Sequence, residues 1–263
     1  MIVVFSENYD PCTNAVVKRL SASKRPWVRL NGEDFGRTFF VSVCISDKGS
    51  SFRITHADGV INSDEVTCIW FRRQGVPQLP ESFSSDESNF AMNEIFSLIA
   101  GLAVVTGPRW INYPPFEKLM NSKSAQLALA ASLGMLLPPT LMSNSVDEVL
   151  DFRSNNGTVL FKTIAGSRRI PIREHSNKAT ASDITREIIF ANILSEEHIK
   201  YLHSIRLAPV QFQAYVEKAY NVRVTYVDSE IFACRIFSQD RDDTRIDFRR
   251  MVISGEIRHE PID

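Results

Sequence analysis

The chain has 263 residues and a mass of 29.8 kDa, and 44% of its residues are hydrophobic and 23% charged. This is the composition of an ordinary globular protein of one or two domains, large enough to bury a core without disulfides or metals. Thirty Lys and Arg residues against 31 Asp and Glu give a net charge of −1. Because no general positive field is present to attract a phosphate backbone, no nucleic acid partner is expected.

Targeting and redox features are those of a cytoplasmic protein. The longest apolar stretch, Ile95 to Val105, is shorter than the roughly 20 residues that cross a bilayer, so it is interpreted as a core helix and no membrane is expected. The N-terminus lacks the basic segment and cleavage pattern of a secretory signal. No C-x-x-C pair occurs, which predicts reduced, buried thiols at Cys12, Cys44, Cys68 and Cys234.

The first 115 residues are predicted to form a small α/β domain. A helix follows Asp10, and a longer helix from Glu87 shows an apolar face with helical spacing until Gly107-Pro108 ends it. The prolines Pro114 and Pro115 fix an extended connection, which predicts the domain boundary. Strands are expected at residues 2–5, 27–30, 38–45 and 66–71, with a hairpin within 52–61.

The rest of the chain is predicted to form a second domain in two parts. The first part has helices at 123–133 and 146–152, a strand at 159–162, and one or two helices between 184 and 202. The second part begins with three β-patterned runs at 210–216, 222–227 and 231–237, with a turn at 228–229 between the last two.

Lys162 is the first candidate for a binding role, because it ends an apolar strand and is followed by a Gly-containing loop at 166–169. A lone strand-end lysine is often a surface residue whose stem lies on apolar neighbours. Backbone amides and guanidinium groups in such a loop can also close over phosphates. The alternating run 210–218 could offer backbone groups to an adenine edge, although any two-stranded hairpin shows a similar pattern.

Several further motifs occur in a fixed order along the chain. In the N-terminal part they are Arg29-Leu30-Asn31-Gly32-Glu33-Asp34 and Ile69-Trp70-Phe71-Arg72-Arg73. In the rest of the chain they are Asn121-x-Lys123-x-x-Gln126-Leu127-x-x-Ala130-x-x-x-Gly134, Pro138-Pro139-Thr140-Leu141, Phe161-Lys162, Gln213-x-Tyr215-Val216-Glu217-Lys218, Val222-Arg223-Val224, Ile236-Phe237-Ser238-Gln239 and Thr244-x-Ile246-Asp247-Phe248-Arg249. The joint order of these motifs resembles the ATP-grasp peptide maturases, in particular the microviridin-type ligases and their grasp-with-spasm subgroup.

The resemblance implies an α/β fold with an N-terminal pre-ATP-grasp domain at 1–115 and an ATP-grasp domain of two α+β lobes, at 116–209 and 210–263. Such enzymes bind ATP and Mg²⁺ and phosphorylate an Asp or Glu carboxylate of a ribosomally made precursor peptide, which has a leader and a core. A Lys amine or a Ser or Thr hydroxyl of the same peptide then attacks, closing an amide or ester ring. Because dimers are common in this family, a homodimer is also expected.

The resemblance further implies a set of site residues. Phosphate contacts are expected from Lys123, from Lys162 and from a covering loop of Gly166, Ser167, Arg168 and Arg169. Gln213, Tyr215 and Val216 would line the adenine pocket, with Glu217 near the ribose hydroxyls. Arg223 would reach the phosphates from the second lobe, while Asp247 and Arg249 would face the acyl phosphate or the peptide. The segment Trp70–Arg73 suits a core-packed strand end with solvated arginines as well as it suits peptide binding.

One departure from the family pattern leaves activity open. Family members place an acidic strand residue and a later Glu-x-Asn near the C-terminus as Mg²⁺ ligands, whereas no Glu-x-Asn follows Arg249 here. The second lobe is therefore expected to be incomplete, and losing the metal would raise the barrier to phosphoryl transfer by several kcal/mol. Two alternatives remain: a non-catalytic ATP-grasp-like protein that binds a leader peptide or partner ligase, and a ligase that adds glutamate to a protein tail.

Overall fold

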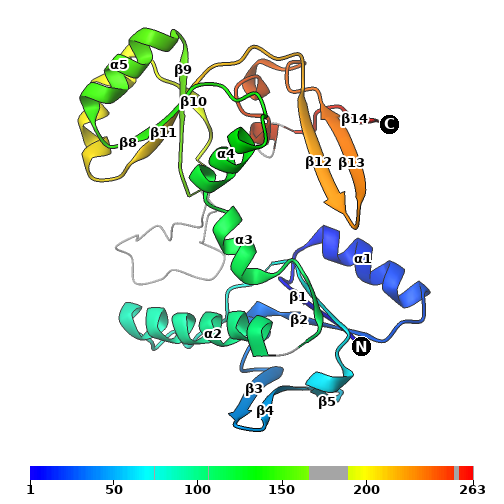
Figure 1. Cartoon of the computed structure of the whole chain (residues 1–263). Coiled ribbons are helices and arrows are strands. Elements are labelled where there is room, and N and C mark those ends of the chain that lie inside the picture. The colour runs from blue at the N-terminus through cyan, green and yellow to red at the C-terminus, as the bar shows by residue number, and fades with distance from the viewer. Residues whose placement is uncertain (74, 106, 166–188, 252–254, 263) are drawn as a thin grey trace. The chain divides into compact units, whose positions relative to one another are not determined.

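The computed structural model describes residues 1–73, 75–105, 107–165, 189–251 and 255–262 (Figure 1). The chain divides into two compact units, Met1–Met120 and Asn121–Asp263. The two prolines expected to form an extended connection instead begin helix α3, Pro114–Met120. That expectation was wrong because the first turn of a helix tolerates proline, whose missing N–H has no intrahelical partner there.

A parallel sheet forms the centre of the first unit, with strand order β2-β1-β6-β7. Its strands are β1 (Ile2–Ser6), β2 (Trp27–Asn31), β6 (Cys68–Phe71) and β7 (Arg109–Ile111). The central strand β1 is apolar and largely buried, as expected of a strand with neighbours on both sides. Helix α1 (Pro11–Ala22) follows β1, and the Asp10 carboxylate caps it by accepting from the N–H groups of Cys12 and Thr13.

An antiparallel meander completes the first unit together with one long helix. The meander consists of β3 (Phe39–Ser46), β4 (Gly49–His56) and β5 (Gly59–Asn62), and the helix is α2 (Ser85–Val105). Side chains from the sheet, the meander and α2 form one core, which contains Val3, Phe39, Ile54, Ile69 and Leu102. The predicted hairpin and the predicted strands of this unit are therefore present.

The 21 residues of helix α2 are long and apolar enough to cross a membrane by length and composition. The sequence analysis predicted a helix from Glu87 but compared only its continuous apolar run, Ile95 to Val105, with the thickness of a bilayer. A core helix of a globular domain passes the same test, and Ile99 and Leu102 of α2 are buried in the core of the first unit. Phe90 and Val104 on the same helix are largely exposed.

The second unit contains a four-stranded sheet of order β10-β9-β11-β8. Its strands are β8 (Thr140–Ser143), β9 (Val159–Lys162), β10 (Asn192–Ile193) and β11 (Val210–Ala214). Helix α5 (Val146–Asn156) lies beside β8 and β11 (Figure 1). The described residues of this unit also form α4 (Lys123–Ser132), which ends before Gly134 at a φ of 74°, and the short α6 (Glu196–Ile199).

A second, three-stranded sheet of order β12-β13-β14 belongs to the same unit. Its strands are β12 (Asn221–Val227), β13 (Glu230–Ile236) and β14 (His259–Ile262). Asp228 and Ser229 join β12 to β13 with φ values of 47° and 71°, as a two-residue hairpin turn requires. The first of the three β-patterned runs, predicted at 210–216, does not join this hairpin. It forms β11, which pairs with β8 and β9, so residues 210–214 share a sheet with the expected first lobe.

The four cysteines are free thiols, in agreement with the absence of paired motifs. Their expected burial is only partly correct, because Cys12 and Cys44 are exposed and Cys68 and Cys234 are partly buried. Cys12 lies in the first turn of α1 and Cys44 on β3, and at both positions the side chain faces away from the core.

Candidate functional site

The strand periodicity of the four-stranded sheet separates a core face from a polar face. Phe212 of β11 is buried in a core with Val149 of α5 and Val159 of β9. Successive strand residues point to opposite faces, so Gln211 and Gln213 lie on the other face of β11. Lys162 lies directly opposite Gln211, and Thr140 directly opposite Gln213, which places all four on that polar face.

Lys162 is the central cation of this face. Its Nζ donates to Gln213 Oε1 at 2.8 Å, and Gln213 Nε2 donates to Thr140 Oγ1 at 2.8 Å. Burial lowers the pKa of Lys162, the Asp247 carboxylate raises it, and Arg249 lowers it further. The net effect is a lowered pKa of Lys162. Its ammonium group is held by a neutral acceptor, the amide oxygen of Gln213.

Lys123 approaches the same place from the first turn of α4. Its Nζ donates to the carbonyl oxygen of Thr163, the residue that follows β9. Burial lowers the pKa of Lys123, as do the charges of Lys162 and Arg249, while Asp247 raises it. The two lysines lie near each other, since the charge of Lys162 acts on Lys123. Their expected contact with phosphates stays a prediction.

Asp247 is 6% exposed and lies among these cations. Its Oδ1 accepts from Arg249 Nε at 2.8 Å and its Oδ2 from Arg249 Nη2 at 2.5 Å, a bidentate pair. Oδ2 also accepts from the N–H of Ala191 at 2.8 Å, and Oδ1 from the N–H of Arg249 at 3.1 Å. Burial alone raises the pKa of this carboxyl, but the hydrogen bonds from Arg249 and Ala191 outweigh it and lower the pKa.

Lys218 is a fourth cation at this site and was not predicted as a site residue. Its Nζ donates to the carbonyl oxygen of Arg245 at 2.8 Å and lies 5.4 Å from the centre of the Tyr215 ring. Burial lowers the pKa of Lys218, and the charge of Asp247 raises it. We call Lys123, Lys162, Lys218, Arg249 and Asp247 the cationic cluster; its positive groups outnumber its carboxylate, so it attracts an anion.

Gln211 is the second residue that sequence reasoning missed. It is 2% exposed, and its Oε1 has no hydrogen-bond partner among the described residues. Its strand position directly opposite Lys162 is the signal that could have identified it, because a buried glutamine in an alternating strand needs a partner. Gln211 therefore offers an acceptor next to the cationic cluster.

The other expected site residues lie less close together. Val216 is 54% exposed and Glu217 is exposed, directly after β11. Arg223 is exposed on β12, and it is not among the charges that shift the pKa values of Lys123 and Lys162. The assignments of these residues to adenine, ribose and phosphate contacts stay predictions. The covering loop expected from Gly166, Ser167, Arg168 and Arg169 lies outside the described residues.

The carboxyl ends of the parallel strands in the first unit form a separate polar cluster. Arg73 Nη1 contacts Glu7 Oε1 at 2.9 Å, and Arg72 Nε lies 3.3 Å from Asp10 Oδ2. Arg29 Nη2 donates to the carbonyl oxygen of Glu7 at 2.5 Å. The arginines of the 70–73 segment are thus paired with buried carboxylates and are not simply solvated. A peptide-binding role for this segment stays a prediction.

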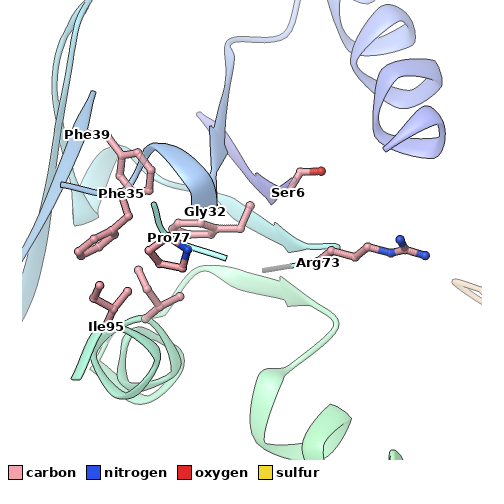
Figure 2. A pocket seen from close by; sticks show the side chains of 9 residues that line it. Ser6, Gly32, Phe35, Phe39, Arg73, Pro77 and Ile95 are labelled. Atoms are coloured by element: carbon pink, nitrogen blue, oxygen red, sulfur yellow. The ribbon is translucent and has the colours of Figure 1, made fainter. Parts of the chain in front are cut away.

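A small cavity lies beside this cluster and is shown in Figure 2. Its volume of about 10 Å³ admits a single water molecule at most. Phe35, Phe39 and Ile95 form its apolar wall, and Arg73 points away from them (Figure 2). A cavity of this size is a packing defect of the core and not a substrate pocket.

A magnesium site does not fit the residues that the structure describes. Within these ranges no group of three or more His, Cys, Asp or Glu side chains could hold a metal ion. The charge of Asp247 acts on all three lysines, but both of its oxygens accept hydrogen bonds from Arg249 and Ala191.

Together, the polar sheet face and the cationic cluster define a candidate site for an anionic ligand in a two-unit α/β protein. Residues 1–114 match the family model described as the MvdD pre-ATP grasp domain. No curated protein matches the sequence.

Solved structures extend the likeness over the whole chain. A Chryseobacterium gregarium RiPP-associated ATP-grasp ligase, in complex with ADP and a leader and core peptide, has a TM-score of 0.83 at 21% identity, covering 100% of this chain and 76% of that one. The macrocyclase MdnC of Microcystis aeruginosa MRC, bound with precursor peptide MdnA, has a TM-score of 0.78 at 23% identity, covering 100% and 79%. The ligase PsnB, complexed with a phosphomimetic minimal precursor, Mg and ADP, has a TM-score of 0.67 at 20% identity, covering 100% and 76%.

These matches confirm the fold class and the likeness to ATP-grasp peptide maturases that were predicted from the sequence. Residues 1–114 match a pre-ATP-grasp domain of the MvdD type, and the chain has the fold of the ATP-grasp ligases. The cationic cluster lies in the part of the chain that follows the pre-ATP-grasp domain.

Proposed function

We propose that this chain is an ATP-dependent ligase that activates a carboxylate of a ribosomally made precursor peptide and closes an amide or ester ring. The observation that carries the proposal is the cationic cluster around Lys162, which lies on the polar face of β9 and β11, within an ATP-grasp fold. Solved structures with the same fold contain ADP and precursor peptides, which supports both ligand classes.

The cluster suits the charge that such a reaction develops. A peptide carboxylate oxygen attacks the γ-phosphorus of ATP, the bond from that phosphorus to the β,γ-bridging oxygen breaks, and ADP leaves with the electron pair. An amine or hydroxyl of the peptide then attacks the acyl phosphate, and inorganic phosphate leaves as the nucleophile loses its proton. The chemistry needs positioning and charge neutralisation more than a strong base. Lys123, Lys162 and Lys218 are the groups expected to donate to phosphate oxygens.

Calorimetric titration of ADP tests the nucleotide part of the proposal. Lys162→Ala removes a charge-assisted hydrogen bond to a phosphate and is expected to weaken binding by about tenfold or more. Lys200→Ala removes an exposed lysine after α6 and serves as the matched control, with unchanged affinity expected. Equal affinity of the wild type and Lys162→Ala would remove Lys162 from the nucleotide site.

Mass spectrometry on candidate precursor peptides tests the ligase part. Ring closure removes one water, about 18 Da per ring, when ATP is present. Addition of single residues to a carboxylate would identify a glutamate-adding ligase instead. Peptide binding without phosphate release or mass change would identify a non-catalytic binding protein and would contradict the proposal.

A further inference from the structure

Three hydrogen bonds connect the backbone before β8 to the ammonium group of Lys162. Thr140 Oγ1 lies 2.9 Å from the carbonyl oxygen of Pro138, Gln213 Nε2 lies 2.8 Å from Thr140 Oγ1, and Lys162 Nζ lies 2.8 Å from Gln213 Oε1. All three side chains are partly buried. We call this the Pro138–Lys162 relay.

The chemistry of its two ends gives the relay one direction. A carbonyl oxygen only accepts, so the hydroxyl hydrogen of Thr140 is donated to Pro138. Thr140 Oγ1 must then accept, which turns the NH₂ group of Gln213 toward Thr140 and the amide oxygen toward Lys162. A lysine ammonium only donates, so the Lys162 end also requires the amide oxygen of Gln213 to face Lys162. Both ends therefore select a single orientation of the Gln213 amide.

The strand register explains why these residues meet. Gln213 of β11 lies directly opposite Thr140 of β8, and on its other side it lies opposite Leu160 of β9. Lys162 is two residues beyond Leu160, on the same face and diagonal to Gln213, within reach of two long side chains. Because β11 is hydrogen-bonded to both neighbours, the relay is built on rigid backbone.

We propose that Thr140 is a positioning residue that aims Lys162 at a bound phosphate through Gln213. The inference rests on the proposed function, since it takes Lys162 to contact the nucleotide. Without the hydroxyl, the Gln213 amide loses the partner that orients it and can turn its NH₂ group toward the ammonium of Lys162. Two donors would then face each other, and Lys162 would leave the position it holds before the ligand arrives.

Isosteric and conservative variants separate this role from packing. Thr140→Val keeps the shape and removes the hydroxyl, so ADP binding is expected to weaken by about three- to tenfold. Thr140→Ser keeps the hydroxyl and loses a methyl group, so near wild-type affinity is expected. If Thr140 acted only through packing, Thr140→Ser would weaken ADP binding more than Thr140→Val. Thr55→Val, at an exposed position on β4 of the first unit, is the matched control and is expected to bind ADP as the wild type does.

A double-mutant cycle tests whether Thr140 acts through Lys162. In the Lys162→Ala background, Thr140→Val is expected to cause no further loss of ADP affinity. The pH profile supplies a second readout: affinity is expected to fall as Lys162 loses its proton, and the midpoint of that fall should move in Thr140→Val and stay in Thr140→Ser. If Thr140→Val does not fold by circular dichroism, Thr140→Ala replaces it in the cycle.

The possible failures are distinguishable. Unchanged affinity in Thr140→Val, equal losses in Thr140→Val and Thr140→Ser, or additive losses in the cycle would each overturn the positioning role while leaving the nucleotide site intact. Unchanged affinity in Lys162→Ala would instead overturn the proposed nucleotide contact on which the positioning role depends.

Discussion

At the scale of single residues, Asp247 is held by its own neighbours: its two oxygens accept four hydrogen bonds, from Arg249 and Ala191. Its expected place facing the acyl phosphate or the peptide stays a prediction. Arg250 reinforces this contact, since its Nη2 donates to Asn192 Oδ1 at 2.7 Å and its guanidinium lies 4.9 Å from the Phe190 ring. We infer that Asp247 holds the segment 190–192 against residues 247–250 and so shapes the cationic cluster.

Asp247→Asn tests this structural role. The amide keeps the shape of the side chain but loses the negative charge that pairs with Arg249 and accepts from the N–H of Ala191. The unfolding free energy of the second unit is therefore expected to fall by about 1–3 kcal/mol. The lower part of that range is favoured because Arg249 is 39% exposed. Far-UV circular dichroism in urea measures the change, and Asp151→Asn on the exposed side of α5 is the control.

The pH dependence of the same pair has a defined sign. The folded-state pKa of Asp247 is lower than its unfolded value of about 3.9, so its stabilisation is fully present above that value and is lost as pH falls through the folded pKa. The difference in stability between the wild type and Asp247→Asn should therefore shrink on acidification below about pH 4. A difference that stays constant across this range would contradict the role given to the charge.

At the scale of elements, helix α1 depends on Asp10, which is 2% exposed. Asp10 Oδ1 accepts from the N–H groups of Cys12 at 2.9 Å and Thr13 at 3.3 Å, and Oδ2 is paired with Arg72. Burial by itself raises the pKa of Asp10, but the N–H donors and the Arg72 charge outweigh it and lower the pKa. The carboxylate therefore joins the start of α1 to the end of β6.

Substitution at Asp10 separates the cap from the ion pair. Asp10→Ala loses both and is expected to destabilise the first unit by about 1–3 kcal/mol, whereas Asp10→Asn keeps a capping oxygen and is expected to cost less. Tryptophan fluorescence in urea reports this unit selectively, because Trp27, Trp70 and Trp110 all lie within it. Glu81→Ala at an exposed position is the control, and equal losses in the two Asp10 variants would contradict a contribution from the cap.

At the scale of the whole molecule, the second unit exposes apolar surface on its hairpin. Val222, Val224 and Tyr226 alternate along one face of β12, and Ile231 of β13 lies directly opposite Tyr226. These four side chains are between 49% and 69% exposed. The outer edge of β12 has no paired strand within the described part of the chain. Exposed strand edges with apolar faces favour pairing with another chain.

Self-association is the resulting prediction, and it includes the homodimer expected from the family. Sedimentation velocity over a range of concentrations should show an assembly that weakens with dilution. Val224→Lys places a charge on the apolar face and is expected to weaken the assembly, whereas Thr225→Lys, on the opposite face of the same strand, should weaken it less. A sedimentation coefficient independent of concentration at the monomer value would contradict the prediction. The cytoplasmic location stays a prediction from the sequence.

Local patterns allowed most individual elements to be predicted. Strand patterns and turn residues located β1 to β5, the helical pattern after Asp10 located α1, and a glycine stop located the end of α4. The pairing partners of the strands were harder to predict. The run that forms β11 resembled a hairpin strand, but it pairs with β8 and β9, because strand pairing depends on contacts between segments far apart in the sequence. The domain division at 115 and 209 stays a prediction.

The sequence by itself determined the order of elements, the family resemblance and Lys123, Lys162 and Arg249 as candidate cations, because propensities and motif spacing are local properties of the chain. Only the tertiary structure decided which groups meet. It placed Lys218 beside Tyr215, Gln211 opposite Lys162, and Asp247 in a bidentate pair with Arg249. It also connected Thr140 to Lys162 through Gln213. These relations depend on sheet register and on the packing of distant segments, where a shift of one residue would turn each side chain to the other face.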